Sequence, residues 1–448
     1  MLSKFFSRGG MLARSLANSI GGKGPVDVVV AWVDGRDRKH RAKRRRYLAD
    51  PGGDTKPQRV AVNAQRFSDN DEIRYCLRSI HNYAPWVRTI WLVTDDQVPA
   101  SIARRRAERY NIRIVDHREI FRGYEQLLPT FNSLAIETML WRIEGLADRF
   151  LYFNDDMMLV GPVKPTDFFS RGGKVNLRGR WTSWTELLEK RTELLEKRTE
   201  LLEKRTELLE KRIAFNAYNK LLGAEMLGYT AERFFTAHHV IYPLLRPAME
   251  QLFEEFQPAF LANAKYRFRD RKQFWPIALH DHLLLKSNRA QMALPQNSAH
   301  FPVGYCLTAS PDDLEMRLKQ LTDGTIRMTC INHLEAVIEK VPDAMRYLSD
   351  ATGPTAPFEK PPRRVLDAVP PGRSDSALQV EARVPAADDG TRIGVETPAA
   401  RHAATPSRTS AALPNSDTSE SQRSETSSCT RSFSPAASAF STRSISSA

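Results

Sequence analysis

The amino-acid sequence predicts an α/β protein with a doubly wound, mostly parallel, Rossmann-like sheet, a helical insertion and a disordered C-terminal tail. Two features of residues 26–159 lead to this prediction. Short apolar runs alternate with segments of helical period, and polar residues follow each run. A parallel sheet explains both features, because its strands are buried on both faces and its ligands bind beyond their carboxyl ends.

Four apolar runs are the expected strands, at residues 26–32, 89–93, 112–115 and 150–153. A helix that begins at Ser68 or Asp69 is expected between the first two, because apolar residues recur at i, i+4 and i+7 from Ile73. Helices near 101–109 and 133–145 fill the next two gaps. Four strands joined by three crossovers make a doubly wound sheet the expected topology.

The composition excludes several classes of protein. The chain has 448 residues, of which 41% are hydrophobic and 27% are charged, enough for one large or two ordinary domains with a core. No segment approaches the roughly 18 to 20 apolar residues of a membrane-spanning helix. The four cysteines are scattered and form no CxxC pair, which favours a reducing compartment over a disulfide scaffold. We therefore expect a cytoplasmic protein, with peripheral contact to the inner face of a membrane at most.

The net charge of +13 is concentrated near the start of the chain. Residues 1–50 contain twelve Lys or Arg and four Asp, a net charge of +8. We treat 1–24 as a basic N-terminal segment that precedes the folded domain of residues 25–345. This charge could meet phosphates, anionic lipid or nucleic acid, and simple solvation is the alternative.

Three further segments differ in composition from the sheet region. Residues 185–212 are four identical copies of TELLEKR, which predict a helical insertion on the order of 42 Å long. Residues 213–345 are expected to be mostly helical. Residues 346–448 are predicted to be disordered, because the end of the chain is rich in Pro, Ala, Ser, Thr and Arg and poor in large apolar side chains.

Acidic residues follow the expected strands. Asp34 comes after the first strand, and Asn154, Asp155 and Asp156 come after the fourth. Adjacent carboxylates at a strand end are suited to hold a hard divalent cation, Mg²⁺ or Mn²⁺, against a diphosphate. A polar turn with solvated acids is the alternative. Because the strand ends meet at one edge of a parallel sheet, we favour a metal site formed by Asp155 and Asp156.

Other positions carry residues suited to phosphoryl chemistry. Asn132 and Ser133 stand at the start of an expected helix, where free amides favour an anion, and Glu137 lies one turn further on the same face. Simple helix capping is the alternative. His239 could act as a general base or acid, and Arg269 could bind phosphate oxygens. A surface histidine and a solvated arginine are the corresponding alternatives.

Taken in order, these motifs resemble the Stealth family, the nucleotide-sugar phosphotransferases that include bacterial capsule polymerases and the catalytic subunit of the animal GlcNAc-1-phosphotransferase. The resemblance covers roughly residues 25–335 and is interrupted by the TELLEKR copies. It rests on residues 26–35, 70–85 with Arg74, 92–97, 115–117, 128–133 with Glu137, 153–156, 167–169, 239–243 with Arg269, and 330–332.

The resemblance implies a role for each matched residue. The donor nucleotide would be bound by residues of the early motifs, namely Asp27, Trp32, Asp34, Arg74, Asn132 and Ser133. The metal would be held by Asp155 and Asp156, Glu137 would lie beside the donor, and His239 and Arg269 would flank the transferred phosphoryl group.

The last matched block departs from the family pattern. The family usually has an acid directly after the Asn, whereas this chain has Asn332-His333. Three readings remain open: His333 takes over the role of the acid, the block is misassigned, or activity is impaired.

The resulting prediction is the transfer of a hexose or N-acetylhexosamine 1-phosphate from a UDP-sugar to a glycan hydroxyl, with release of UMP, in the synthesis of a phosphodiester-linked capsular polysaccharide or exopolysaccharide. The expected partners are the UDP-sugar and a glycan or polysaccharide acceptor, and no nucleic acid. One alternative is a metal-dependent glycosyltransferase that releases UDP. The other is a non-catalytic scaffold that binds a polyanion or a membrane, with its site disabled at His333.

Overall fold

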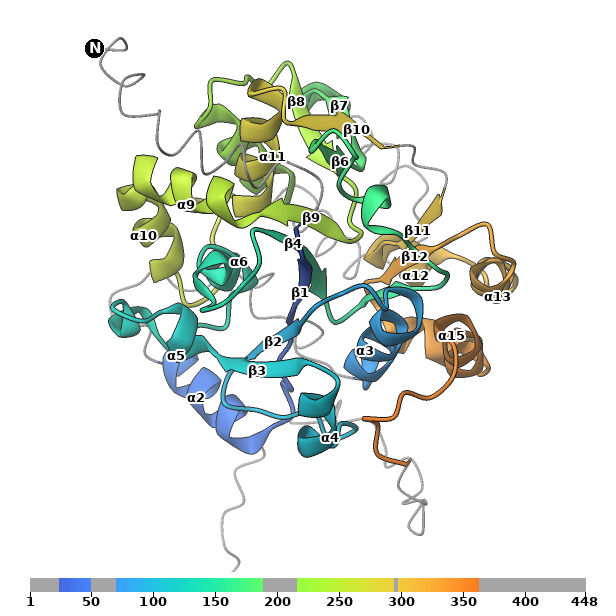
Figure 1. The fold of residues 1–448 in the computed structure, drawn as a ribbon. Coiled ribbons are helices and arrows are strands. Elements are labelled where there is room, and N and C mark those ends of the chain that lie inside the picture. The colour runs from blue at the N-terminus through green and yellow to red at the C-terminus, as the bar shows by residue number, and fades with distance from the viewer. Residues whose placement is uncertain (1–23, 50–69, 188–215, 294–296, 362–448) are drawn as a thin grey trace, which may run out of the picture. The chain divides into compact units, whose positions relative to one another are not determined.

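The computed structural model describes residues 24–49, 70–187, 216–293 and 297–361 (Figure 1). Three predictions lie outside these residues: the basic segment before residue 24, the TELLEKR helix beyond residue 187, and the tail beyond residue 361. Among the residues described, no helix is long and apolar enough to cross a membrane.

A five-stranded sheet in the order β3-β2-β1-β4-β9 forms the centre of the fold. The parallel strands are β1 (Val26–Ala31), β2 (Ile90–Thr94), β3 (Ile112–Asp116) and β4 (Arg149–Asn154), and β9 (Tyr242–Leu245) pairs antiparallel with β4. The predicted mostly parallel sheet is confirmed, and each predicted strand is present within one residue of its expected bounds. The chain runs from β1 out to β3 and returns to β4 on the other side of β1, so the switch point of the sheet lies between β1 and β4.

The helices of the first half flank this sheet (Figure 1). They are α2 (Arg38–Ala49), α3 (Glu72–Tyr83), α4 (Arg104–Arg109), α5 (His117–Ile120) and α6 (Ser133–Glu137). Helix α3 buries the predicted stripe of Ile73, Leu77 and Ile80 in the core that also contains the sheet. Its amphipathic pattern is therefore satisfied by packing, as expected for a helix that covers one face of a sheet.

The expected helix at 133–145 is wrong in length. Helix α6 ends at Glu137, a 3₁₀ turn at Leu140–Arg142 follows, and Gly145 has a φ of 80°. The hydroxyl of Thr138 donates 2.6 Å to the Leu134 carbonyl and accepts from Asn263, which competes with continued helical hydrogen bonding at this point. The sequence period alone does not report that competition.

The region after residue 213 is mostly helical, as expected, but short strands also lie in it. Residues 216–225 are helical, and the helices that follow are α9 (Arg246–Glu255), α10 (Gln257–Lys265), α11 (Pro276–Lys286), α12 (Val303–Thr308), α13 (Pro311–Lys319), α14 (Leu334–Lys340) and α15 (Ala344–Thr352). Short strands lie between them: β8 (Phe234–Ala237) pairs with β7 (Gly179–Thr182), and β10 (Ala290–Met292) pairs with β6 (Val175–Leu177). A three-stranded sheet contains β11 (Ser298–Phe301), β12 (Met328–Ile331) and β5 (Met157–Leu159). Strands of three or four residues are too short to show a period of two, which is why the sequence did not predict them.

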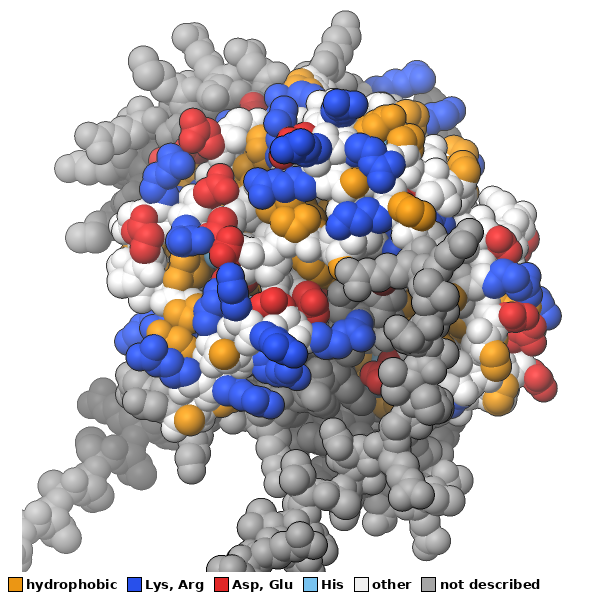
Figure 2. Space-filling model, turned by 90° about the horizontal axis from the view of Figure 1, so that it is seen from below, with side chains coloured by type: hydrophobic (Ala, Val, Ile, Leu, Met, Phe, Trp, Pro, Cys, Tyr) orange, Lys and Arg blue, Asp and Glu red, His pale blue; other side chains and the backbone are white. Residues whose placement is uncertain are grey.

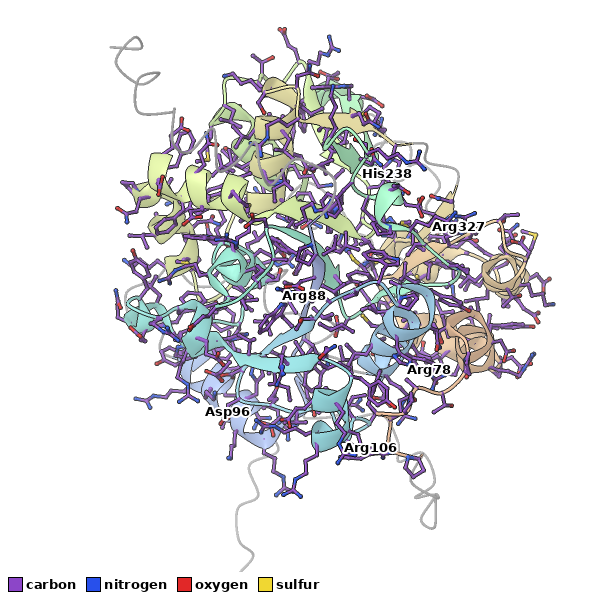
Figure 3. All side chains as sticks on the ribbon, viewed as in Figure 1. Arg78, Arg88, Asp96, Arg106, His238 and Arg327 are labelled. Atoms are coloured by element: carbon purple, nitrogen blue, oxygen red, sulfur yellow. The ribbon has the colours of Figure 1, made fainter. Side chains whose placement is uncertain are left out.

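The expected domain end at residue 345 is also wrong. Helix α15 buries Tyr347, Leu348 and Ala351 in a core that it shares with β11, β12 and α13. Beyond it, the carboxylate of Glu359 receives two 2.7 Å bonds from the Arg78 guanidinium on α3. Figure 3 labels Arg78 on the side of α3 that faces α15. The folded part of the chain therefore extends beyond residue 345 and includes Glu359.

Candidate functional site

Polar side chains gather where β1, β2, β3 and β4 end, at what we call the carboxyl edge of the sheet. Asp95 follows β2 and accepts hydrogen bonds from His40 Nδ1 at 2.8 Å and from Lys43 Nζ at 2.7 Å, both on α2. These bonds, opposed by burial, hold the pKa of Asp95 well below its usual range. Helix α2 is thereby fixed to the carboxyl edge, beside the end of β2.

Asp155 and Asp156 follow β4, where the sequence predicts a metal site. The Asn332 amide, directly after β12, donates 2.8 Å to Asp156 Oδ2, and its carbonyl oxygen lies 2.6 Å from His300 Nε2. The charge of Asp156 adds to the effect of burial in raising the pKa of Glu72 on α3. Carboxylates are therefore grouped beside the end of β4, and a bound divalent cation would relieve the repulsion between their charges.

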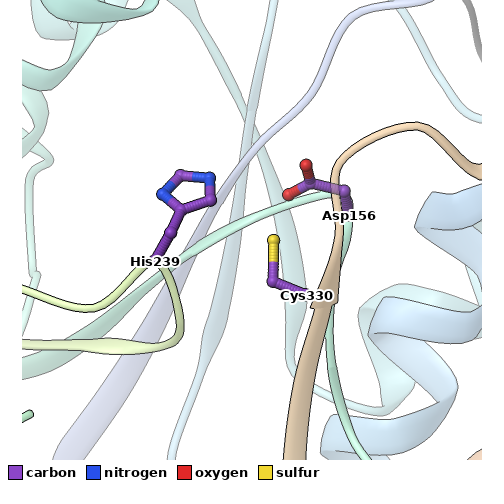
Figure 4. A group of neighbouring side chains, drawn as sticks. All are labelled: Asp156, His239 and Cys330. Atoms are coloured by element: carbon purple, nitrogen blue, oxygen red, sulfur yellow. The ribbon is translucent and has the colours of Figure 1, made fainter. Parts of the chain in front are cut away.

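His239 lies between β8 and β9 and faces Asp156. Ligand atoms of Asp156, His239 and Cys330 all lie within 4.8 Å of one another. Figure 4 shows the three side chains converging from separate backbone segments. The Nδ1 atom of His239 lies 2.7 Å from the hydroxyl of Tyr242, which orients the imidazole ring. The structure thus brings together the predicted base and one predicted metal ligand.

Glu137 and Arg269 form the other half of the site. Glu137 is 6% exposed, and its Oε2 accepts a 2.7 Å hydrogen bond from Trp275 Nε1. Arg269 donates to the Ser133 hydroxyl and interacts electrostatically with Glu137 and Asp156. Burial raises the pKa of Glu137, while the charge of Arg269 acts in the opposite direction. A buried carboxylate therefore lies near a partly buried guanidinium.

Two buried tyrosines connect the halves of the site. The Tyr152 hydroxyl donates 2.8 Å to Asn154 Oδ1 and lies 3.4 Å from Glu137 Oε1. Its ring stacks with that of Tyr242 at 6.2 Å between centroids, and Tyr242 in turn contacts His239. Glu137, on α6, is therefore linked to His239 by side-chain contacts alone.

The role expected for Asp27 at the nucleotide is wrong. Asp27 is the second residue of β1, so it lies at the amino end of the strand, away from the carboxyl edge. Its buried carboxylate accepts from Arg88 Nε at 2.8 Å, Trp91 Nε1 at 2.9 Å and the Ala147 amide at 2.8 Å. Figure 3 labels Arg88, just before β2. With its oxygens occupied in this way, Asp27 joins β1 to β2 and to the loop before β4.

Trp32 and Asp34 follow β1 at the carboxyl edge, as expected. Trp32 is 5% exposed, and its Nε1 has no hydrogen-bond partner among the described residues. Asp34 Oδ1 accepts from the Arg36 amide at 2.7 Å, and the Asp34 backbone exchanges hydrogen bonds with the side chain of Gln97. The turn that contains Asp34 is therefore held against the loop after β2.

Asn132 and Arg74 have structural partners. Asn132 caps α6, accepting from the Leu134 amide at 3.1 Å, and donates 2.9 Å to both the Tyr266 carbonyl and Gln273 Oε1. Arg74 pairs with Asp71 at 2.6 Å, at the start of α3. Ser133, another residue expected to bind the donor, contacts Arg269. Asn132 instead joins the start of α6 to the loop of residues 266–273.

The last block of the site is divided between two residues. Asn332 reaches Asp156, whereas His333 is the N-cap of α14 and accepts from the Ala336 amide at 3.1 Å through Nδ1. In this structure Asn332 therefore contacts the Asp156 carboxylate, and His333 caps α14. A catalytic role of His333 stays a prediction.

Sequence reasoning missed Tyr152, Trp275 and His300. Tyr152 lies inside the apolar run of β4, where an aromatic residue signals only core packing. Trp275 is the last residue of a run of aromatic and basic residues that begins at Lys265, and its partner Glu137 is 138 positions away. His300 lies on β11 and meets Asn332 through the pairing of β11 with β12. No local pattern reports such contacts.

Fold and site together define an α/β protein with carboxylates, histidine and arginine at the carboxyl edge of a parallel sheet. Two family models match the chain: Stealth protein CR1, conserved region 1, at residues 24–51, and Stealth protein CR2, conserved region 2, at residues 66–177. The chain therefore contains both of these conserved regions of the Stealth family. The resemblance inferred from the motifs is thereby confirmed.

Curated relatives carry phosphotransferase names. An exopolysaccharide phosphotransferase of Streptomyces coelicolor is 35% identical over 335 residues, which cover 73% of this chain and 54% of the relative. An exopolysaccharide phosphotransferase of Nocardia farcinica is 31% identical over 360 residues, 76% of this chain and 63% of the relative. The N-acetylglucosamine-1-phosphotransferase subunits alpha/beta of Homo sapiens are 47% identical over 118 residues, 26% of this chain and 9% of the relative. The chain thus spans between 9% and 63% of the length of these relatives.

Proposed function

We propose that this protein transfers a hexose or N-acetylhexosamine 1-phosphate from a UDP-sugar to a glycan hydroxyl and releases UMP, in the synthesis of a phosphodiester-linked capsular polysaccharide or exopolysaccharide. One observation carries the proposal: Asp156 and His239 lie within 4.8 Å of each other at the carboxyl edge, beside Arg269 and Glu137. Phosphoryl transfer needs a base, a carboxylate-held cation and a fixed positive charge in one place. The names of the relatives agree with this chemistry.

The proposed reaction is an in-line displacement at the phosphorus that carries the sugar. The acceptor hydroxyl oxygen forms a bond to this phosphorus, and the bond to the oxygen that bridges to UMP breaks. His239 takes the hydroxyl proton, and the electron pair of the broken bond leaves on UMP. The hydrogen bond between Nδ1 and Tyr242 holds the ring so that Nε2 serves as the base.

Arg269 supplies positive charge for the phosphoryl oxygens. The orientation of its guanidinium is fixed, because one of its nitrogens donates to the Ser133 hydroxyl and the charge of the Glu137 carboxylate attracts it. A group preorganised in this way stabilises charge that develops in the transition state without reorganising at that moment. Glu137 acts here as a positioning residue, held in turn by Trp275.

The residues fit a hard divalent cation. Asp155 and Asp156 offer carboxylate oxygens at the end of β4, and both add to the effect of burial in raising the pKa of the Cys76 thiol, which shows how closely negative charge is grouped there. When bound, Mg²⁺ or Mn²⁺ would neutralise diphosphate oxygens and make UMP a better leaving group. Asn332 fixes the Asp156 carboxylate for this purpose.

Three buried polar atoms support a nucleotide site at the ends of β1, β2 and β3. Trp32 Nε1, Thr94 Oγ1 and His117 Nε2 have no hydrogen-bond partner among the described residues. A buried polar group without a partner costs about 1–3 kcal/mol, which a bound ligand relieves. We assign this part of the carboxyl edge to the uridine of the donor, that is, to its uracil base and its ribose.

The released nucleotide is the direct test. The purified protein is incubated with UDP-GlcNAc or another UDP-hexose, Mg²⁺ and a panel of glycan acceptors, and UMP is resolved from UDP. We expect metal-dependent UMP, lost in Asp156→Asn and kept in Asp167→Asn, a matched change at a residue outside the site. UDP in place of UMP would shift the assignment to a glycosyltransferase, and the absence of both across the panel would contradict transfer.

Helix α2 supports polyanion binding as a second candidate function. It has no acidic residue, and five of its basic side chains are exposed without an ion pair to any described acid: Arg38, Lys39, Arg41, Arg45 and Arg46. Figure 2 shows many Lys and Arg side chains on the face that lies at the bottom of Figure 1, where α2 is labelled. Salt-sensitive binding of a polyphosphate or of anionic vesicles that survives Asp155→Ala with Asp156→Ala, together with no turnover, would favour this candidate.

A further inference from the structure

The group formed by Asp156, His239 and Cys330 contains a ligand that hard cations do not use. Cys330 is fully buried on β12, and Figure 4 shows its sulfur beside the Asp156 carboxylate and the His239 ring. Mg²⁺ takes oxygen ligands, whereas Zn²⁺ takes thiolate, imidazole and carboxylate. A set of one oxygen, one nitrogen and one sulfur atom within 4.8 Å therefore matches a different class of cation from the Asp155 and Asp156 pair.

Supporting contacts already orient each member of this group. Asn332 donates 2.8 Å to Asp156 Oδ2, and the same amide lies 3.2 Å from Cys330 Sγ. Tyr242 holds His239 through Nδ1, which directs Nε2 toward a ligand. Such outer contacts are typical of protein metal sites, where they fix the tautomer and the angle of each ligand. The cost of ordering three side chains on binding is thereby reduced.

Charge also favours a divalent cation here. A bound cation deprotonates a coordinating thiol, so Asp156 and the Cys330 thiolate together offset two positive charges. Without a cation the opposite holds: burial, and next the charge of Asp156, raise the pKa of the Cys330 thiol well above its ordinary value.

We propose that Asp156, His239 and Cys330 bind Zn²⁺ or a similar thiophilic cation, and that the bound cation inhibits the enzyme by occupying Asp156 and His239. Binding follows from the geometry alone, whereas inhibition rests on the proposed function. The inference adds a regulatory ligand to the site, because the thiol has no part in the transfer step itself.

Cadmium provides a probe of binding that needs no activity. The full chain is prepared with Cys429→Ser, and Cd²⁺ is added while the ultraviolet charge-transfer band of a thiolate–cadmium bond is recorded. One equivalent is expected to give the band in this parent and in Cys306→Ser, a matched change at a buried cysteine whose thiol contacts the Phe301 carbonyl at 3.5 Å. The band is expected to be lost in Cys330→Ser and Cys330→Ala, each checked for folding by circular dichroism, and Zn²⁺ is expected to abolish it in the parent by competition.

The outcomes separate the inference from the proposed function. Absence of the band in the parent, or its persistence in both Cys330 variants, overturns the metal site. For inhibition, UMP formation in Mg²⁺ is followed as Zn²⁺ is added, and each variant is compared with its own rate without Zn²⁺. At least tenfold lower sensitivity of Cys330→Ser supports inhibition, and equal sensitivity overturns it. If the band depends on Cys330 but no UMP forms, the metal site stands and the proposed function fails.

Discussion

The indole Nε1 of Trp275 donates a 2.7 Å hydrogen bond to Oε2 of Glu137, a buried carboxylate 138 positions earlier in the chain. Trp275 lies directly before α11, whereas Glu137 ends α6, so the bond joins two helices that the sequence does not connect. The same carboxylate interacts with Arg269. The indole therefore helps to hold the acid that positions the proposed phosphoryl-binding arginine.

Replacing Trp275 by Phe is expected to raise the pKa of Glu137 further. Burial already raises it, and the indole hydrogen bond is one of the interactions that lower it. Trp275→Phe removes this hydrogen bond to the charged form of Glu137. If transfer needs the charged form, the fall of kcat on the acidic side of its pH profile moves to higher pH, by about one unit. The pH dependence of kcat measures this. Trp141→Phe is the control, because Trp141 Nε1 donates to the Thr138 carbonyl instead of a carboxylate, and an equal shift in both variants would refute the assignment.

Arg269→Lys is expected to lower kcat by about a hundredfold or more while changing KM less. Lysine keeps the charge but not the planar donors that contact Ser133 and face the phosphoryl group. Arg267→Lys is the control, since Arg267 donates 2.9 Å to the Pro129 carbonyl and stacks on Tyr47. Steady-state kinetics with the UDP-sugar separate the two. If both substitutions reduce kcat alike, Arg269 has no special part in the transfer.

The strands were predictable from sequence because each combines several consecutive buried apolar residues, as Val28, Val29 and Val30 do in β1. The clustering of acids at the carboxyl edge was predictable from parallel topology. The partners of those acids were not: Asn332 meets Asp156 through a register between β12 and β5 that no local pattern encodes. Asp27 shows the converse: the expected strand at residues 26–32 already places Asp27 at its amino end, away from the carboxyl edge where the motif match implied a nucleotide-binding role.

Acidification below pH 6.5 is expected to destabilise the fold through His282. Its Nδ1 donates 2.6 Å to the Ala278 carbonyl and its Nε2 accepts from the Phe235 amide at 2.9 Å, so the neutral ring is fully paired. Burial lowers the pKa of His282 to about 4, although the Ala278 carbonyl opposes this. Between pH 6.5 and 4 the unfolded chain binds a proton that the folded chain does not, so the free energy of unfolding falls as pH falls, by about 3 kcal/mol.

Urea unfolding at pH values from 8 to 4 measures this dependence. His282→Gln loses stability at all pH values because its packing changes, so the variant is compared with its own value at pH 8. Its further decrease on acidification is expected to be smaller than that of the wild type. Parallel curves would show that His282 does not titrate in this range.

The ion pair between Arg78 and Glu359 is expected to stabilise the fold, because both side chains are at most 5% exposed and make two 2.7 Å contacts. Arg78→Met leaves a buried carboxylate without its partner, at a cost of about 3–5 kcal/mol in the free energy of unfolding, and Arg78→Met with Glu359→Leu recovers much of it. Arg346→Met removes an exposed pair with Asp343 and is expected to change the free energy of unfolding far less. Equal losses in Arg78→Met and Arg346→Met, measured by urea unfolding, would contradict this role.

The same pair predicts that a chain ending at residue 345 unfolds far more readily than one ending at residue 361, because only the longer chain retains α15 and the partner of Arg78.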